Sequence, residues 1–205
     1  MGEAILQFKE EVVKPTRVQA MKLIDEHCKK YKDELVNDFI SHFRQFCVQI
    51  TNVQKTGAKG KVAHFTYSLL RTQIQQGKGL FLAEATDSSW LLDRTPIRST
   101  YDANWAIKPL FQMEEIWAQE LKQQSLTYAG KVTLADFEKL RLQEAGVIHS
   151  FVAALIRGAL FAAVETQEYA EIDKEDIVEV RVGEYMDWSE AVFKEDRSMK
   201  GSIDQ

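Results

Sequence analysis

Arg157 is the residue whose surroundings in the sequence most clearly need a chemical explanation. Its neighbours one helical turn away are all apolar: Ala153, Ala154, Leu160 and Phe161. A buried guanidinium needs an anion, and no carboxylate on its own predicted helix lies within reach. We therefore expect Arg157 to be at least half buried and to bind an acceptor outside its own helix.

A stripe of polar residues runs along the same predicted helix. Asp136, Gln143, Ser150 and Arg157 recur every seven residues, and seven residues are close to two helical turns. Arg157, with Ser150 as second donor, predicts a site for an anionic ligand. His149 adjoins the stripe, although helical geometry rotates it by about 80° from Arg157. The alternatives are a structural ion pair or a solvated helix edge for Arg157, and a core position for His149.

A second candidate site lies near the C-terminus, where aromatic and acidic residues are mixed. This segment holds Glu184, Tyr185, Asp187, Trp188 and Glu190. Aromatic faces combined with carboxylates can hold a cationic ligand. The alternative is the end of a hairpin whose acids are only solvated.

Other common chemistries have no matching pattern in the sequence. There is no Gly-x-Ser-x-Gly motif, and the histidines have no metal-ligand spacing. The segment KTGAKGK, residues 55 to 61, contains lysines and glycines, but only two residues lie between its glycines, whereas a phosphate-binding loop has four. We expect a flexible loop there, no metal and no cofactor.

Composition and charge limit the classes of partner. The chain has 205 residues, 45% of them hydrophobic, with 26 Lys and Arg against 31 Asp and Glu and a net charge of -5. This charge disfavours nucleic acid and acidic membrane surfaces. Cys28 and Cys47 both fall at apolar positions of a helical pattern. With no secretion signal recognised at the N-terminus, we expect a reduced, cytoplasmic compartment.

Three stretches of the sequence have helical periodicity. They cover residues 16 to 53, about 109 to 128, and 134 to 171. The first stretch predicts packing on the body of the domain, with an inter-subunit helix pair as the alternative. The middle of the last is apolar nearly all round, which is typical of an enclosed helix. The rival interpretation is a membrane span, which a central arginine makes unfavourable by about 3 kcal/mol.

Alternating patterns predict strands in two regions. LFLAEAT and WLLD, within residues 79 to 93, predict a β-hairpin, and IVEVRVGEY followed by EAVFKE predicts strands within 177 to 194. Residues 62 to 76 fit either a helix or a strand, and we favour a helix. Residues 94 to 108 show no sustained period and predict a connecting loop.

The predicted fold is α+β and mainly helical, with a long central helix packed against other helices and a small antiparallel β-sheet made of hairpins. Residues 1 to 54 form an N-terminal amphipathic helical region, 55 to 195 an α+β body in the same single domain, and 196 to 205 a disordered tail.

The absence of a catalytic motif favours a soluble, non-catalytic binding or assembly protein that forms homo-oligomers. The alternative is an enzyme or binding protein for a small anionic ligand, with a pocket near Arg157, Ser150 and His149.

Overall fold

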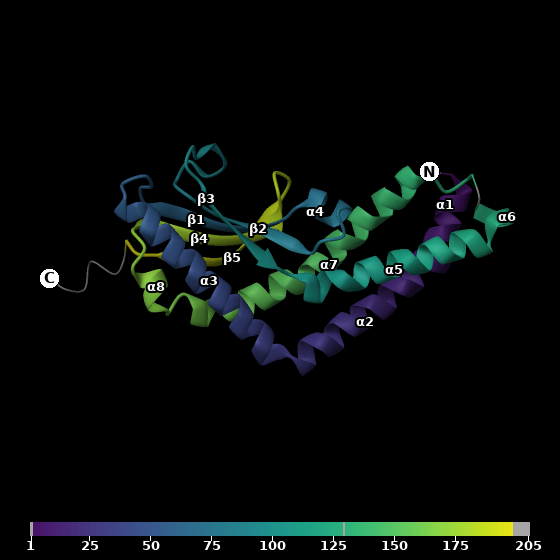
Figure 1. Ribbon diagram of the computed structural model, residues 1–205, viewed down its shortest axis with the longest axis horizontal. Helices are drawn as coiled ribbons and strands as arrows, with labels where there is room; N and C mark the ends of the chain where they lie inside the picture. The colour runs from purple at the N-terminus through teal and green to yellow at the C-terminus, as the bar shows by residue number, and fades with distance from the viewer. Residues whose placement is uncertain (1, 129, 199–205) are drawn as a thin grey trace. The chain divides into compact units, whose positions relative to one another are not determined.

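The computed structural model describes residues 2–128 and 130–198, which fall into two compact units. The helix unit comprises Met1–Lys32, Arg71–Gly79 and Ala103–Val152. The sheet unit comprises Asp33–Leu70, Leu80–Asp102 and Ala153–Gln205. The fold is α+β and mainly helical, as the sequence predicts (Figure 1).

Amphipathic helices build the helix unit around an aromatic core. Its elements are α1 (Glu3–Phe8), a π-helical turn (Lys9–Val13), α2 (Lys14–Lys30), α4 (Arg71–Gln75), α5 (Asn104–Gln123), α6 (Ser125–Tyr128) and the first part of α7 (Leu134–Ala163). Phe8 packs edge-on against Tyr128 with ring centroids 5.3 Å apart. The buried indole of Trp117 donates a hydrogen bond of 2.8 Å to Thr16 Oγ1, so this polar atom is satisfied inside the core.

One mixed sheet organises the sheet unit. The strands are β1 (Val62–Leu69), β2 (Leu80–Thr86), β3 (Ile97–Asp102), β4 (Lys174–Glu184) and β5 (Ser189–Asp196), and the helical elements are α3 (Lys32–Lys55), the 3-10 turn η2 (Trp90–Leu92), α8 (Gln167–Ala170) and the end of α7. Among the described residues the sheet has five strands in the order β3-β2-β1-β4-β5. β1 and β4 are parallel and the other pairs are antiparallel.

The central strand β1 gives the sheet one apolar and one polar face. Phe65 and Tyr67 point to the face covered by α3, where their rings lie 5.6 Å from Phe43 and 5.3 Å from Phe39. Thr66 alternates with them, so its side chain points to the opposite face. In Figure 1 the loop after β2 and the loop between β4 and β5 both rise on the side away from α3.

The strand predictions are confirmed in part. β4 and β5 occur where the alternating valines predict them, and LFLAEAT is β2. Residues 62 to 69, however, form a strand rather than a helix. Val62, Phe65 and Leu69 fit a helical spacing, but Ala63, Phe65, Tyr67 and Leu69 also alternate with the polar residues His64, Thr66 and Ser68, and this two-residue period is the one that the structure follows. WLLD is not a strand, since it contains the turn η2, and the predicted loop at 94 to 108 contains β3. The sheet is consequently mixed rather than made of antiparallel hairpins.

Helix boundaries also differ from the predictions. The first predicted helix is two helices that break at Tyr31, and α5 begins at Asn104 with Pro109 inside its first turns. The last predicted helix ends at Ala163 rather than at residue 171. Among the described residues, α7 is the one helix with the length and hydropathy of a membrane span, and 44% of its most apolar window is buried. The predicted tail lies mainly outside the described residues, except that β5 continues to Asp196.

Gly183 allows the hairpin of β4 and β5 to close. A Cβ at this position would collide with the carbonyl oxygen of Trp188 and lie 2.5 Å from Cα of Ser189, so backbone atoms would have to move. We predict that Gly183→Ala lowers the free energy of unfolding by about 1–3 kcal/mol, the range for overpacking. Urea denaturation measures this change.

Gly158 is the matched control, because it lies in α7 and a Cβ added there would meet no atom within 4 Å. Gly158→Ala should leave stability unchanged or raise it by up to about 1 kcal/mol, since alanine favours helix. Equal destabilisation by both substitutions would contradict the close-approach explanation.

Candidate functional site

The polar face of the sheet carries a hollow that we call the sheet groove. It consists of two adjoining cavities of about 180 Å³ and 50 Å³. The strands supply its floor, and the loops after β2 and between β4 and β5 supply its walls. The two cavities share the following lining residues: Thr66, Glu84, Trp90, Leu91, Tyr185 and Met186.

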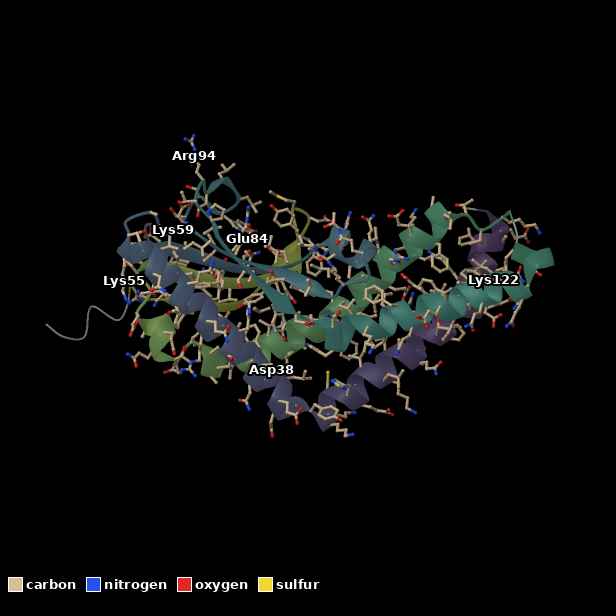
Figure 2. All side chains as sticks on the ribbon, in the orientation of Figure 1. Asp38, Lys55, Lys59, Glu84, Arg94 and Lys122 are labelled. Atoms are coloured by element: carbon tan, nitrogen blue, oxygen red, sulfur yellow. The ribbon has the colours of Figure 1, made fainter. Side chains whose placement is uncertain are left out.

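Four residues in register cross the floor of the groove. Arg98 of β3 lies opposite Glu84 of β2, Glu84 lies opposite Thr66 of β1, and Thr66 lies opposite Arg181 of β4. Glu84 is only 8% exposed at its side chain, and its carboxylate accepts a hydrogen bond of 2.8 Å from Arg98 Nε. Figure 2 labels Glu84 beneath the loop whose tip carries Arg94. The floor thus presents a carboxylate between two walls.

Arg181 fastens both walls to the floor. Its guanidinium donates to Ser189 Oγ at 3.0 Å, to the carbonyl oxygen of Ser189 at 2.9 Å and to Glu179 Oε2 at 2.8 Å. The same guanidinium lies 4.9 Å from the ring centroid of Trp90. The hydrogen bond from Arg181 holds the pKa of Glu179 below its usual range. Arg181 therefore acts as a structural cation within the floor.

Trp90 forms one wall and is held in an unusual backbone conformation. Its indole stacks on His64 with ring centroids 5.3 Å apart and an interplanar angle of 30°. Trp90 has φ 50° and Met186, on the other wall, has φ 58°; these are the non-glycine residues with positive φ in the described part of the chain. Side chains in this region carry strain, which proteins tend to retain at functional sites.

His64 supports Trp90 as a neutral ring. Burial lowers the pKa of His64, the nearby Arg181 lowers it further, and Glu179 and Asp87 oppose both effects. Neither His64 Nδ1 nor Trp90 Nε1, both buried, has a hydrogen-bond partner among the described residues. The stack is therefore held by ring contacts rather than by hydrogen bonds at these atoms.

A buried ion pair holds the loop after β2. Lys59 Nζ donates to Asp93 Oδ2, and both side chains are 1% exposed. Asp93 also accepts hydrogen bonds from the backbone N–H of Asp87 at 2.9 Å and of Thr95 at 2.8 Å. Burial raises the pKa of Asp93, but the hydrogen bonds from Lys59, Thr95 and Asp87 outweigh burial and leave that pKa below its usual range. The stabilisation by this carboxylate is therefore present at neutral pH and is lost as the pH falls through the lowered pKa.

Acidic groups outnumber basic groups around the groove. The described lining residues include four carboxylates and two guanidiniums: Glu84, Asp93, Glu184 and Asp187 against Arg98 and Arg181. Arg98 balances the charge of Glu84, Lys59 that of Asp93 and Glu179 that of Arg181, so the acidic excess comes from Glu184 and Asp187. The groove consequently attracts cations more than anions.

The anion site predicted from the sequence does not coincide with this groove. Arg157 binds an acceptor outside its own helix, as predicted, because its guanidinium lies 3.1 Å from Glu190 of β5. The two side chains are 49% and 47% exposed, so the expectation that Arg157 is at least half buried is just met. Such an exposed pair contributes at most about 1 kcal/mol.

Ser150 and His149 lie in the helix unit, whereas Arg157 lies in the sheet unit. Ser150 Oγ donates to the carbonyl oxygen of Val147 at 2.7 Å. His149 is buried, as its alternative interpretation as a core residue requires.

The aromatic and acidic segment near the C-terminus does lie at the groove. Glu184, Tyr185, Asp187 and Trp188 line it, while Glu190 pairs with Arg157 instead. The other half of the site was missed in the sequence, namely Thr66, Glu84, Trp90 and Arg98. A signal was present, since a single glutamate inside the apolar strand LFLAEAT needs a polar environment.

Comparisons with known proteins do not identify the site. No family model matches the chain, and no curated protein and no solved structure matches it. Within the described residues, no group of three or more His, Cys, Asp or Glu side chains could hold a metal ion.

The ion pair of Lys59 and Asp93 provides a test of how the wall is held. We predict that Lys59→Met lowers the free energy of unfolding by about 3 kcal/mol, because it leaves a buried carboxylate without its charged partner. Urea denaturation at pH 7 measures the loss. Lys61→Met, at an exposed position in the same loop, is the control and should change stability by less than about 0.5 kcal/mol. Similar effects of the two substitutions would show that the pair does not anchor the loop.

Proposed function

We propose that the protein is a non-catalytic binding protein whose sheet groove takes an organic cation, an alkylammonium or alkylguanidinium group. The observation that carries the proposal is the carboxylate of Glu84, which lies at the floor of a cavity walled by Trp90, Tyr185 and Trp188. A carboxylate accepts hydrogen bonds at about four lone-pair positions, so the bond from Arg98 does not saturate it.

Aromatic walls support a cationic rather than an anionic ligand. A cation over the face of a tryptophan or tyrosine gains about 0.5–2 kcal/mol, with the larger values at desolvated sites. The indole of Trp90 lies 4.9 Å from the guanidinium of Arg181, so one contact between a cation and an aromatic ring is already present at the groove. The excess of carboxylates in the lining and the net charge of -5 act in the same direction.

Organisation of the walls before any ligand arrives also supports a binding role. Lys59 and Asp93 fix one wall, and Arg181 fixes the other. The left-handed backbone of Trp90 and Met186 fits a site whose strain is maintained by its surroundings. A rigid groove loses little conformational freedom on binding, which favours affinity.

Self-association and a cytoplasmic location, both expected from the sequence, stay predictions. We do not propose an anion site at Arg157, because its guanidinium already forms an ion pair with Glu190 and Arg157 lines neither cavity of the groove.

Isothermal titration with n-butylammonium and n-butylguanidinium tests the proposal. We expect millimolar binding of both cations by the full-length protein, and we expect Glu84→Gln to weaken it about ten-fold, which corresponds to about 1.4 kcal/mol. The loss follows from removing the buried negative charge while keeping the size of the side chain. Circular dichroism checks that the variant is folded.

Glu165→Gln is the matched control, because it removes the same charge from an exposed position in the same unit but outside the groove. It should change the affinity by less than two-fold. No detectable binding of either cation, or an equal loss in both variants, would refute the proposed function. Tighter binding of n-butyrate than of the two cations would also refute it.

A further inference from the structure

We infer that the groove binds a lysine or arginine side chain of another polypeptide rather than a free amine. This inference rests on the proposed function and specifies its ligand class. Its basis is the combination of an acidic, aromatic interior with an apolar rim.

The rim of the groove exposes large apolar side chains on both loops. We define the rim as Leu91, Leu92, Met186 and Trp188, whose exposed fractions are 54%, 82%, 64% and 47%. Three of them also line the cavities, and Leu92 follows Leu91 in η2. Exposed apolar side chains that surround a binding hollow are typical of surfaces that a protein partner covers.

The exposed Leu92, which lies outside both cavities, favours a ligand side chain that belongs to a polypeptide over a free small molecule. A ligand confined to a cavity of about 180 Å³ would leave Leu92 in water, because Leu92 lines neither cavity. A polypeptide that inserts one side chain would lay its flanking residues on the rim. Interfaces of this kind concentrate their affinity in one anchor that fills a pocket surrounded by contacts that exclude water.

Both the alkyl stem and the charged head group of a lysine or arginine match the interior of the groove. Their alkyl stems can pack on the aromatic walls while the charged head reaches the carboxylate at the floor. Glu184 and Asp187, which also line the larger cavity, add charge of the sign that attracts a basic segment. Arg94 does not oppose this entry, because in Figure 2 its side chain points away from the sheet at the tip of its loop.

Selection from a random nine-residue peptide library displayed on phage tests the inference with the full-length protein. We expect enrichment of sequences with lysine or arginine at one fixed position and apolar residues on either side of it. Enriched peptides are then synthesised, and replacement of the fixed lysine or arginine by norleucine should weaken binding at least ten-fold. Fluorescence anisotropy measures this change.

Rim variants test the second half of the inference. Leu92→Ser should weaken an enriched peptide about five-fold or more, because the peptide's flanking residues lose their apolar contact. Leu134→Ser, which changes a similarly exposed leucine in the helix unit, should leave peptide affinity within two-fold. Equal effects of the two variants would overturn a role for the rim.

The outcomes separate this inference from the proposed function. If the two butyl cations bind but no peptide with a fixed basic residue is enriched, the polypeptide ligand is wrong while the cation site stands. If neither peptides nor cations bind, both are wrong. If Glu84→Gln changes the mass of the protein in light scattering, the groove is occupied by a second copy of the chain, which overturns a separate partner.

Discussion

The buried ion pair between Lys59 and Asp93 is the interaction on which the candidate site depends. It joins the loop before β1 to the loop after β2, and both side chains are almost fully removed from water. Asp93 also holds the backbone at Asp87 and Thr95, so a single carboxylate fixes both ends of the turn that contains Trp90. The ion pair acts together with the contacts of Trp90 with His64 and Arg181, which also hold the turn η2 over the sheet. A buried pair is weak evidence for net stability, but removal of one partner is costly because it leaves the other charge buried and unpaired.

The two faces of β1 explain why a polar groove exists in a sheet this small. One face is sealed by aromatic packing against α3, which gives the strands a fixed apolar side. The opposite face then carries Thr66, Glu84, Arg98 and Arg181 in register. Arg98 pairs with Glu84 across strands, whereas Arg181 pairs with Glu179 of its own strand. The cross-strand row fixes the carboxylate of Glu84, and the two loops limit its access to water. Fold and site thus share the same alternation of side chains.

Periodicity predicted the α+β class and the alternating strand β4. The acids and aromatic rings near Trp188 indicated a candidate site there. Periodicity did not predict β1, because Val62, Phe65 and Leu69 also fit a helical spacing and because its parallel partner β4 lies more than 100 residues away along the chain. The sequence contained a signal for Glu84, a lone acid in an apolar strand, but not its partner Arg98, because β3 was predicted as a loop. The apolar helical neighbours of Arg157 predicted a site for an anionic ligand, but its guanidinium reaches Glu190 at the surface.

The most direct test of a cation site between the two loops is to follow the four tryptophan indole N–H signals by nitrogen-edited NMR during titration with n-butylguanidinium. Trp90 and Trp188 line the groove, whereas Trp105 and Trp117 lie in the helix unit. We expect the signals of Trp90 and Trp188 to shift together along one saturable binding curve while that of Trp117 stays in place. Shifts confined to Trp105 and Trp117, or no saturable shift of Trp90, would contradict a cation site in the groove.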